Sequence, residues 1–507
     1  MKDFAQEPLI IGILGSGIMG RGIAQIAATA GVGVQLYDLD RKVCDDAVRF
    51  IEGMLDRAVE KGRLTQEQAN DSKAKISIAP DLGALNQADL VIEAVVEKLE
   101  IKQQLFRELE EIVTSDCILA TNTSSLSVTA VANAVKTQSR VAGCHFFNPV
   151  PLMKLVEVIA GVRTDAEVIS NLIKFVKRIG HTPVNVKDSP GFLVNHFGRG
   201  LNTEGLRVLA EGVAEPHNID KVIRDVIGLR MGPFELMDLT ALDVTCPVSE
   251  QIYEQFYHES RLRPTPTLRQ RFIAGILGRK AGEGFYLYEN GEKVSPAEQE
   301  APDLDFDDGI WVSKRYPMLA DKLIALLSGA GIKLDHGKQP ESNSIIMITP
   351  LGQDTTTAVI EESLDPVRSV AVDVFLNIDK RITLMGSPGA DPEIIKTAWS
   401  ILARTGRNIT VIKDSTGFIA QRIFANIINT ACEIAQLGIA LPDDIDTAAR
   451  LGLGYPQGPL TMGNEAGPDQ VMEILKNIQS ITGDQRYRPS LWLQRRAALN
   501  LSLFHCE

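Results

Sequence analysis

Two residues at the ends of predicted strands could carry out an acid–base reaction. His145 ends the predicted strand RVAGCHF, just before the proline-broken loop FNPVP, and Glu157 lies in the next predicted strand, LVEVI. A histidine that titrates near pH 7 is suited to remove the proton of an alcohol. A carboxylate bonded to its other ring nitrogen would fix the tautomer. The pair therefore predicts a base and its orienting partner; the alternative is a buried core histidine and a surface glutamate.

Polar residues follow a neighbouring predicted strand. Asn122-Thr123-Ser124-Ser125 come directly after CILA and could bind a substrate oxygen and a nicotinamide amide. The same residue types are ordinary helix N-caps, which is the alternative interpretation. Asn195, near the start of a helical region, is a further candidate donor to an oxygen that becomes a carbonyl.

A glycine-rich turn predicts the oxidant of such a reaction. Gly15-Ser16-Gly17-Ile18-Met19-Gly20 stands between the apolar run LIIGIL and a helix rich in small residues. Gly15 permits the tight turn, Gly17 lets a pyrophosphate approach the backbone, and Gly20 lets the helix pack on the strand. Asp38, at the end of the next predicted strand, would accept hydrogen bonds from ribose hydroxyls. The motif predicts an NAD site that includes Ile18 and Met19 in the first helical turn.

The elements that position these residues alternate between strands and helices. Short β-branched runs and amphipathic segments follow one another from residue 9 to about 187, which predicts a doubly wound, mostly parallel sheet. From Ser189 the periodicity is helical, interrupted by Gly and Pro, to about Tyr288. The predicted fold class is α/β, with a Rossmann-type sheet followed by all-helical C-terminal domains.

An internal repeat shows that the second of these helical domains is a copy. RIGHTPVNVKDSPGF at Arg178 recurs as RTGRNITVIKDSTGF at Arg404, with Gly191 and Gly417 226 positions apart (417 − 191). SIIMITP, SVAVDVF and RITLMG precede the second copy as a small α/β remnant without a glycine fingerprint, so the copy is predicted to be degenerate. Four domains are predicted: 1–188 for NAD binding, 189–294 helical, 295–412 connecting segment and remnant, and 413–507 the second helical copy.

Bulk composition excludes several protein classes. The chain has 507 residues and a net charge of −13 that is spread along its length, which argues against nucleic acid and anionic membranes as partners. Six cysteines without C-x-x-C spacing indicate neither a zinc site nor a disulfide framework. No leader-like or membrane-spanning stretch is recognisable, so we expect a cytoplasmic protein.

These motifs together resemble the 3-hydroxyacyl-CoA dehydrogenase family. The resemblance covers residues 9–290 and rests on GILGSGIMGRGIA, DLVIEAVVE, ATNTSSLSV, HFFNPVPLMKLVEVI, DSPGFLVN and KAGEGFY. It implies oxidation of the 3-hydroxyl of an acyl-CoA with NAD. The implied active-site set is Ser124, His145, Glu157 and Asn195.

The resemblance also implies further binding residues. Glu93, Lys98, Asn148 and Lys280 fall at positions associated with the cofactor, and Ser124 and Asn195 with the substrate. A helical hairpin after the second strand of the family carries a lysine that meets the coenzyme A phosphates. Lys61, in FIEGMLDRAVEKGRL, is the match here; a solvated lysine on a helix face is the alternative.

The C-terminal segments RLGLGYPQGPL and GDQRYRPSLWLQRRA resemble a longer branch of the family, that of the bacterial 3-hydroxyadipyl-CoA dehydrogenases of phenylacetate catabolism. This implies a dicarboxylic acyl-CoA, for which Arg199 and Arg230 are candidate readers. The repeat places Gln421 where the first copy has Asn195, so we expect the second copy to bind no NAD. It could cover a surface that a partner subunit covers in shorter members, and a homo-oligomer stays possible.

Two other functions stay open at this point. A dehydrogenase of free hydroxy acids or sugar acids has the same architecture and a related catalytic pair. A non-catalytic NAD-binding scaffold could also arise from a duplicated enzyme, although the intact set of four residues argues against it.

Overall fold

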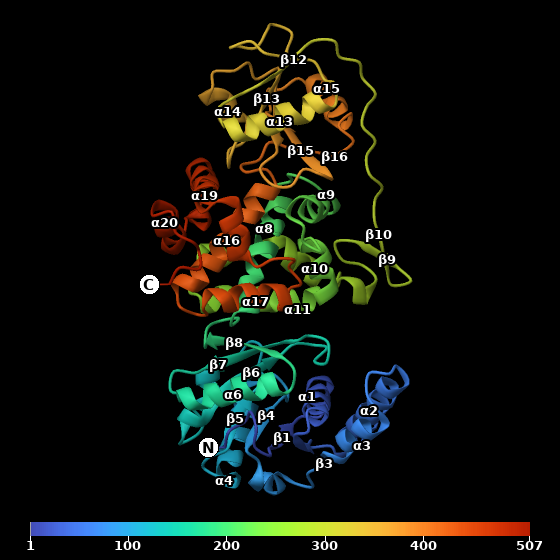
Figure 1. The fold of residues 1–507 in the computed structure, drawn as a ribbon, viewed down its shortest axis with the longest axis vertical. Helices are drawn as coiled ribbons and strands as arrows, with labels where there is room; N and C mark the ends of the chain where they lie inside the picture. Colours follow the sequence, from blue (N-terminus) through green and yellow to red (C-terminus); the bar gives the residue numbers. More distant parts are fainter. Residues whose placement is uncertain (1, 507) are drawn as a thin grey trace. The chain divides into compact units, whose positions relative to one another are not determined.

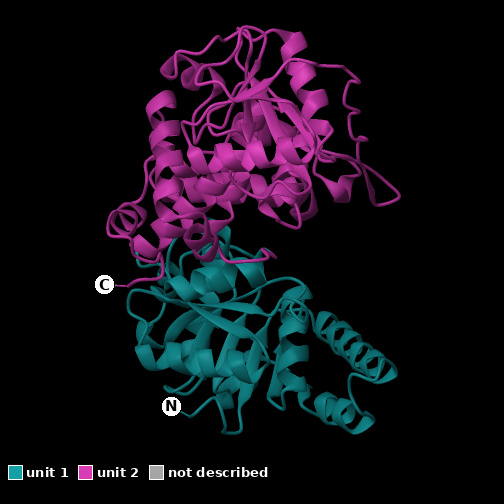
Figure 2. Ribbon diagram, turned by 45° about the horizontal axis from the view of Figure 1, so that its top comes forward, with its two compact units in different colours: residues 1–196, 437–453 teal, residues 197–436, 454–507 magenta. Residues whose placement is uncertain are grey.

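A computed structural model describes residues 2–506, which form two compact units (Figure 2). Unit 1 contains the chain up to residue 196 together with residues 437–453, and unit 2 contains residues 197–436 and the chain from residue 454 onward. A segment of the second helical copy therefore belongs to the unit that holds the first sheet.

Unit 1 is built on an eight-stranded sheet in the order β3-β2-β1-β4-β5-β6-β7-β8 (Figure 1). All neighbouring strands are parallel except β6 and β7, which are antiparallel. The strands are β1 (Ile10–Leu14), β2 (Gly33–Tyr37), β3 (Ile76–Ile78), β4 (Leu90–Glu93), β5 (Ile118–Thr121), β6 (Val141–Phe146), β7 (Leu155–Ala160) and β8 (Thr182–Lys187). The predicted doubly wound sheet is confirmed.

Helices bury both faces of this sheet, which explains why its central strands are continuous apolar runs. In β4, Leu90 and Ile92 join one core while Val91 joins the other. The helices of unit 1 are α1 (Ile18–Thr29), α2 (Arg41–Glu60), α3 (Gln66–Ala74), η1 (Leu82–Gln87), α4 (Leu99–Ile112), α5 (Val128–Ala132), η2 (Gln138–Arg140), α6 (Ala166–Arg178), α7 (Val194–Phe197) and α17 (Pro442–Gly452), with α7 reaching the unit boundary. The helices α2 and α3 form the expected hairpin between β2 and β3.

Unit 2 holds the remaining helices and a second sheet. The helices of the first copy are α8 (Arg199–Ala210), α9 (Pro216–Val222), η3 (Ile223–Ile227), α10 (Pro233–Thr240), α11 (Leu242–Gln255), η4 (Ser260–Leu262), α12 (Pro266–Ile273) and η5 (Arg279–Ala281). Those of the second copy are α16 (Ala420–Gln436), α18 (Pro459–Ala466), α19 (Pro468–Thr482), η6 (Gln485–Tyr487) and α20 (Leu491–Ala498). A short hairpin, β9 (Leu287–Glu289) with β10 (Glu292–Val294), ends the first helical copy.

The second sheet has the order β12-β11-β13-β14-β15-β16. Its elements are β11 (Ile310–Val312), α13 (Pro317–Gly329), β12 (Leu334–Asp335), β13 (Ile345–Ile348), α14 (Thr355–Glu361), β14 (Ser369–Asp373), β15 (Arg381–Gly386), α15 (Pro392–Ala403) and β16 (Asn408–Ile412). From β11 onward, and apart from the additional two-residue strand β12, strands and helices repeat the order that begins at β4 in the first sheet, including one antiparallel pair, β14 with β15. The copy therefore lacks counterparts of β1, α1 and β2, which carry the glycine turn and Asp38.

In the predicted connecting segment and remnant, 295–412, the part that precedes SIIMITP does more than connect domains: residues 310–335 belong to the second sheet and its core. They form β11, α13 and β12, and Ala320, Leu323 and Leu327 of α13 are buried in the core of the second sheet. The charged and Pro-containing flanks hid a helix whose apolar residues recur at helical spacing.

Hydrogen bonds related by the 226-residue offset occur in both units. In unit 1 the Lys187 amide donates to Ile439, and in unit 2 the Lys413 amide donates to Val213; the four positions correspond pairwise. In unit 2, the side-chain amide of Asn426 also donates to the backbone carbonyl of Gly200, its own counterpart, where α8 packs on α16. Each helical copy thus provides the segment that extends the last strand of the other copy's sheet.

Within residues 2–506, no helix combines the length and the apolar character that crossing a membrane requires. The cysteines of this part of the chain form no disulfide with one another, and all but Cys506 are buried.

Candidate active site and dinucleotide site

The glycine turn after β1 has the geometry that was predicted for it. Gly15 has φ +90°, and a Cβ there would lie 2.6 Å from the carbonyl oxygen of Ala94. A Cβ on Gly20 would lie 1.8 Å from the carbonyl oxygen of Gly15, so only glycine lets α1 approach the turn this closely. A Cβ on Gly17 would meet nothing within 4 Å, so the backbone at the start of α1 is open to a ligand.

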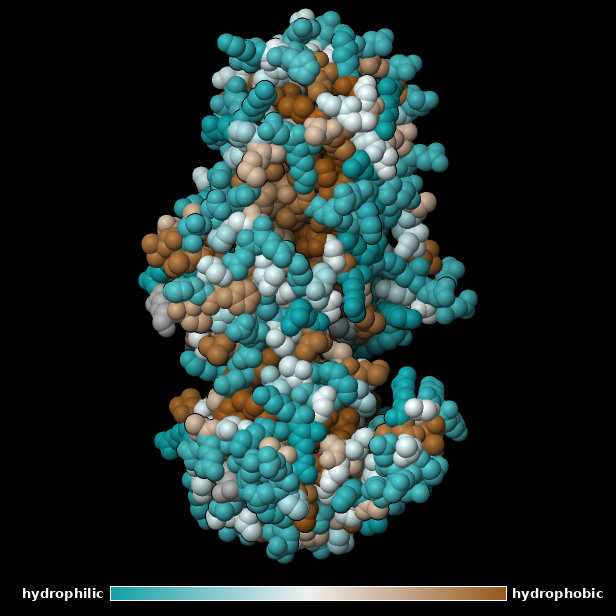
Figure 3. Space-filling view, viewed as in Figure 1, coloured by the Kyte–Doolittle hydropathy of each residue, from teal (hydrophilic) through white to brown (hydrophobic). Residues whose placement is uncertain are grey.

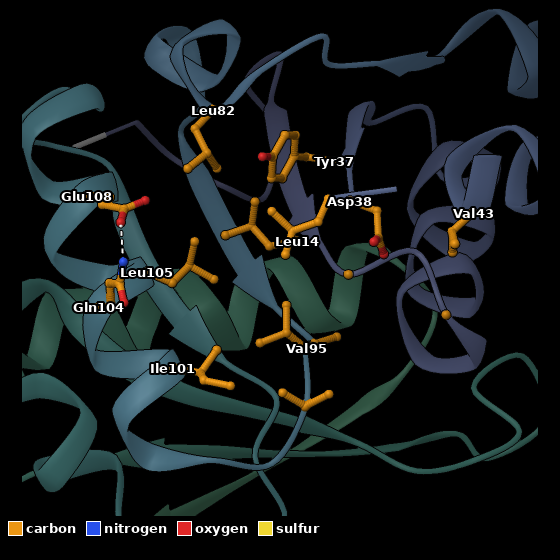
Figure 4. Close-up of a pocket in the computed structure, with 15 residues that line it drawn as sticks. Leu14, Tyr37, Asp38, Val43, Leu82, Val95, Ile101, Gln104, Leu105 and Glu108 are labelled. Atoms are coloured by element: carbon orange, nitrogen blue, oxygen red, sulfur yellow. Dashed lines mark hydrogen bonds between the residues drawn. The ribbon is translucent and has the colours of Figure 1, made fainter. Parts of the chain in front are cut away.

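A cavity of about 630 Å³ opens at the carboxyl ends of β1, β2 and β4 (Figure 4). It is lined by Gly15 and Gly17 and by apolar side chains such as Val95 and Ile101. Asp38 also lines it, and its carboxylate accepts a hydrogen bond from the Ser16 amide at 2.8 Å, which ties the acid to the turn. The size of the cavity, its apolar walls and the Asp38 carboxylate beside the turn fit an adenosine with its ribose, so the residues present fit NAD.

His145 and Glu157 face each other across the antiparallel pair β6·β7. Their side chains are joined by a hydrogen bond of 2.6 Å between Nδ1 and Oε2, and they are 5% and 1% exposed. The other oxygen of Glu157 accepts the amides of Leu193 and Val194, at 3.0 and 2.8 Å, so the carboxylate cannot turn away. Among residues 2–506, no hydrogen bond engages Nε2 of His145, which leaves that nitrogen available to a substrate.

The polar loop after β5 lies beside this pair. Asn122 accepts the amide of Phe146 at 2.8 Å and so holds the end of β6, one residue beyond His145. The side chain of Asn195, on α7, donates to the carbonyl of Ser124 at 3.5 Å. The carboxyl ends of β5 and β6 therefore bring together Ser124, His145 and Asn195, the edge where open α/β sheets bind ligands.

Comparison with known families agrees with this geometry. The model for the NAD binding domain of 3-hydroxyacyl-CoA dehydrogenases matches residues 10–189. The model for the C-terminal domain of these enzymes matches twice, over residues 191–288 and 417–502. The chain belongs to the 3-hydroxyacyl-CoA dehydrogenase family. It is an oxidoreductase with NAD as its cofactor, and the resemblance inferred from the motifs is confirmed.

The relatives match either about half of the chain or nearly all of it. The chain is 36% identical over 489 residues to 3-hydroxyadipyl-CoA dehydrogenase of Escherichia coli (strain K12), which covers 96% of this chain and 97% of that protein. Human mitochondrial hydroxyacyl-coenzyme A dehydrogenase is 38% identical over 283 residues, 55% of this chain and 90% of its own length. The crystal structure of 3-hydroxybutyryl-CoA dehydrogenase from E. coli K12 has a TM-score of 0.86 at 35% identity, covering 97% of this chain and 99% of that one.

Two residues that the sequence interpretation missed organise the loop after β5. One oxygen of Glu97 accepts the amides of Ser124 and Ser125, at 3.0 and 3.2 Å, and the hydroxyl of Thr123. Lys102, 1% exposed, bridges the other oxygen of Glu97 at 3.1 Å to Glu93 at 2.6 Å. Burial opposes ionisation of Glu97, but the charge of Lys102 and the hydrogen bond from Thr123 outweigh it and hold the pKa of Glu97 below its usual range.

Glu93, predicted to bind the cofactor, is wholly buried. One of its oxygens accepts from Lys102 and from the Val95 amide, and the other from the Thr121 hydroxyl. In this arrangement the carboxylate supports the site through Lys102, and it presents no oxygen to the cavity. The sequence EAVVEK contains both Glu93 and Glu97 as candidate cofactor-binding acids. Only the structure distinguishes them, because Glu93 is buried and Glu97 is partly exposed.

The remaining predicted residues are distributed over both units. Lys98 and Asn148 are exposed, at the N-cap of α4 and just after β6, and Ile18 and Met19 begin α1. Lys61 is exposed at the C-cap of α2, in the hairpin. Lys280 lies in unit 2, where it pairs with Asp243. Their contacts with ligands stay predictions.

Proposed function

We propose that the chain oxidises the 3-hydroxyl of a 3-hydroxyacyl-CoA to the 3-oxoacyl-CoA, with His145 as the base and Glu157 as the residue that positions it. The observation that carries this proposal is the 2.6 Å bond between His145 Nδ1 and Glu157 Oε2, in the same sheet as the glycine turn and the cavity that fits NAD. Family membership supports the reaction class.

The residues of the chain divide the work as follows. The glycine turn and Asp38 would hold NAD, which would supply the hydride acceptor for C3. His145 takes the hydroxyl proton at Nε2, and Glu157 keeps Nδ1 protonated and stabilises the imidazolium that forms. Ser124 and Asn195 hold the oxygen as it becomes a carbonyl. Glu97 and Lys102 keep the Ser124 loop in place.

A substrate panel tests this function. Wild-type protein with NAD should form NADH from 3-hydroxybutyryl-CoA or 3-hydroxyadipyl-CoA and none from the unesterified acids, because the thioester and coenzyme A provide binding energy. NADH formed from the free acids alone would establish the hydroxy-acid alternative. Absence of NADH with every thioester and acid of the panel would revive the scaffold interpretation.

A dicarboxylic substrate is the finer part of the proposal. The relative that covers 96% of the chain is named 3-hydroxyadipyl-CoA dehydrogenase, which supports it. Of the two candidate readers, Arg199 is buried beside Ser249, where burial lowers its pKa to about 10, and Arg230 is exposed. Arg230→Ala should reduce kcat/KM for 3-hydroxyadipyl-CoA and spare 3-hydroxybutyryl-CoA; equal loss on both would exclude a role in reading the distal carboxylate.

The coenzyme A contact of Lys61 and the setting of the protein are also proposed. Lys61→Ala should raise KM for the thioester without lowering kcat, since a phosphate contact far from C3 gives uniform binding. Six cysteines without C-x-x-C spacing, five of them buried, favour a reducing cytoplasm. Since the second sheet lacks β1 and β2 counterparts, we expect one NAD per chain; two equivalent sites in a titration would contradict this.

A further inference from the structure

The second sheet has its own cavity at the edge that corresponds to the NAD site of the first. In the first sheet that site lies where β1 and β4 end side by side. In the second sheet β11 corresponds to β4, and the two-residue strand β12 occupies the neighbouring place, parallel to β11. A cavity of about 830 Å³ lies beyond the ends of β11 and β12.

The topology of the second sheet makes this edge a ligand-binding position. The chain leaves β11 through α13 toward β12 on one side, whereas it leaves β13 through α14 toward β14 on the other. Open α/β sheets bind ligands beyond the carboxyl ends of strands where the connections diverge in this way. This switch point lies between β11 and β13, and the cavity adjoins it at the end of β11, although the glycine turn is gone.

The lining of this cavity differs in charge from that of the NAD cavity. Lys314 and Arg315 follow β11, and His336 and Lys338 follow β12. Within the described residues, the charged groups of Lys314, Arg315 and Lys338 form neither a hydrogen bond nor an ion pair, and all three side chains belong to exposed residues. Cations that form no direct ion pair with a carboxylate are poised for an external anion.

The two carboxylates that line the cavity are already engaged. Glu361 accepts the side-chain amide of Gln353 at 2.9 Å, and Glu362 accepts the hydroxyl of Ser313. Burial raises the pKa of Glu362, and the hydrogen bond from Ser313 and the charge of Arg315 offset only part of that rise. The three cations Lys314, Arg315 and Lys338 thus outnumber the two carboxylates of the lining.

Hydrogen bonds from the strands β11 and β12 hold the loop that carries His336 and Lys338. Asp335 accepts the Gly337 amide at 2.8 Å with one oxygen, and the Glu341 amide and Ser344 hydroxyl, both at 2.8 Å, with the other. The indole of Trp311 donates to the Gly337 carbonyl at 2.9 Å. Ligand binding therefore does not have to order this loop, which lowers its entropic cost. Figure 3 shows that hydrophilic residues predominate at the end of unit 2 that carries β12.

We propose that this cavity binds a ligand with a terminal phosphate or pyrophosphate group, such as a nucleoside diphosphate or the phosphorylated end of coenzyme A. Cationic side chains suit a terminal phosphate with two or more charges, whereas the pyrophosphate diester of NAD requires the close backbone approach that Gly15 and Gly17 allow in the first site. The volume lies in the range of small-molecule sites.

Calorimetric titration of the full chain at saturating NAD tests the proposal, with inorganic pyrophosphate, ADP and coenzyme A as probes. The double variant Lys314→Glu/Arg315→Glu should weaken binding of pyrophosphate and ADP about a hundredfold, since two charge-assisted contacts become repulsive. Lys476→Glu on α19 reverses one positive charge outside the lining of the cavity; it is the control and should bind as wild type does.

Further measurements distinguish binding in this cavity from binding in unit 1 and identify the kind of phosphate ligand. Quenching of Trp311 fluorescence should accompany binding and disappear in Trp311→Phe while the calorimetric signal remains. Tighter binding of ADP than of coenzyme A would assign a free nucleotide, and the reverse would assign the coenzyme. Binding that survives the double variant but is lost in Lys61→Glu, or no binding of any probe to wild-type protein, would overturn the proposal.

Discussion

The antiparallel strand pairs β6·β7 and β14·β15 have the same register in the two sheets, but they carry different side chains at the position of the catalytic pair. In unit 1, His145 of β6 pairs with Glu157 of β7; at the matching register in unit 2, Asp373 of β14 pairs with Thr383 of β15. Thr383 is Glu157 displaced by the 226-residue offset (383 − 157). The base and its orienting acid in the first copy thus correspond to an acid and a hydroxyl in the second.

Hydrogen bonding in the second copy serves to fasten loops. Gln421, the counterpart of Asn195, accepts the Gly352 amide at 2.8 Å and donates to Asp373 at 3.0 Å and to the Pro350 carbonyl at 3.2 Å. Among residues 2–506, Oδ2 of Asp373 and the hydroxyl of Thr383 have no hydrogen-bond partner. The polar residues of the second site remain buried, but they do not form a proton-transfer pair.

A purely structural motif persisted in both copies. Asp188 accepts the amides of Val128 and Thr129 at the start of α5, and Asp414 accepts those of Thr355 and Thr356 at the start of α14. Helix capping contributes about 1 kcal/mol to stability wherever it occurs. The comparison teaches that the duplication kept what the fold needs and lost what the reaction needs.

The sharpest test of this comparison substitutes the residue at each of the two matched positions, His145 and Asp373, in separate variants. His145→Ala should lower turnover about a thousandfold, because general-base catalysis is lost, and should leave the NAD affinity unchanged. Asp373→Asn should keep wild-type turnover. Steady-state NADH formation and NAD titration measure both; equal losses in the two variants would end the distinction between the copies.

The second test concerns the orienting acids. Glu157→Gln should lower turnover about a hundredfold, since an amide can neither stabilise the imidazolium nor satisfy His145 Nδ1 as a carboxylate does. It should retain the fold, because the amide oxygen can still accept from Leu193 and Val194. Thr383→Val, the matched change, should not alter kcat. Wild-type turnover of Glu157→Gln would remove the proposed role.

A third test concerns Asp38, which lines the first cavity and has no counterpart in the second. Asp38→Ala should weaken NAD binding about tenfold, the value of a charge-assisted hydrogen bond to ribose, and should reduce the preference for NAD over NADP. The second cavity contains no counterpart of β2, so no such preference is expected there. Unchanged selectivity for NAD in this variant would show that Asp38 serves only to hold Ser16.

Much of the fold and part of the site could be predicted from sequence. The glycine turn, Asp38 and the strand ends were predictable because local spacing determines them. Glu97 and Lys102 were missed because their importance comes from tertiary contacts: Glu97 reaches amides 27 and 28 residues away. The strand β11 and the short edge strand β12 were missed for a related reason, since three- and two-residue strands have too little periodicity to be recognised.

The smallest expected effect concerns the stability cost of the buried Asp373. Burial raises its pKa, and the hydrogen bonds from Gln421 and Phe375 and the charge of Lys322 compensate only in part. A carboxyl whose folded-state pKa is raised binds its proton more tightly when folded, so stability falls as pH rises from the unfolded-state pKa through the folded one. Above that window Asp373→Asn should be more stable than wild type by about 1 kcal/mol, because a neutral amide is cheaper to bury.

Thermal unfolding from pH 4 to pH 8 measures this difference. The gain of Asp373→Asn should be largest at pH 8 and should shrink toward pH 4, because the folded wild-type carboxyl keeps its proton to a higher pH than the unfolded one. The reverse slope would mean that the carboxylate is stabilised in the folded state, so that the second site holds a counter-charge at Asp373. In that case the second copy would have kept an electrostatic function at the position of the lost base, and the contrast with His145 would have to be redrawn.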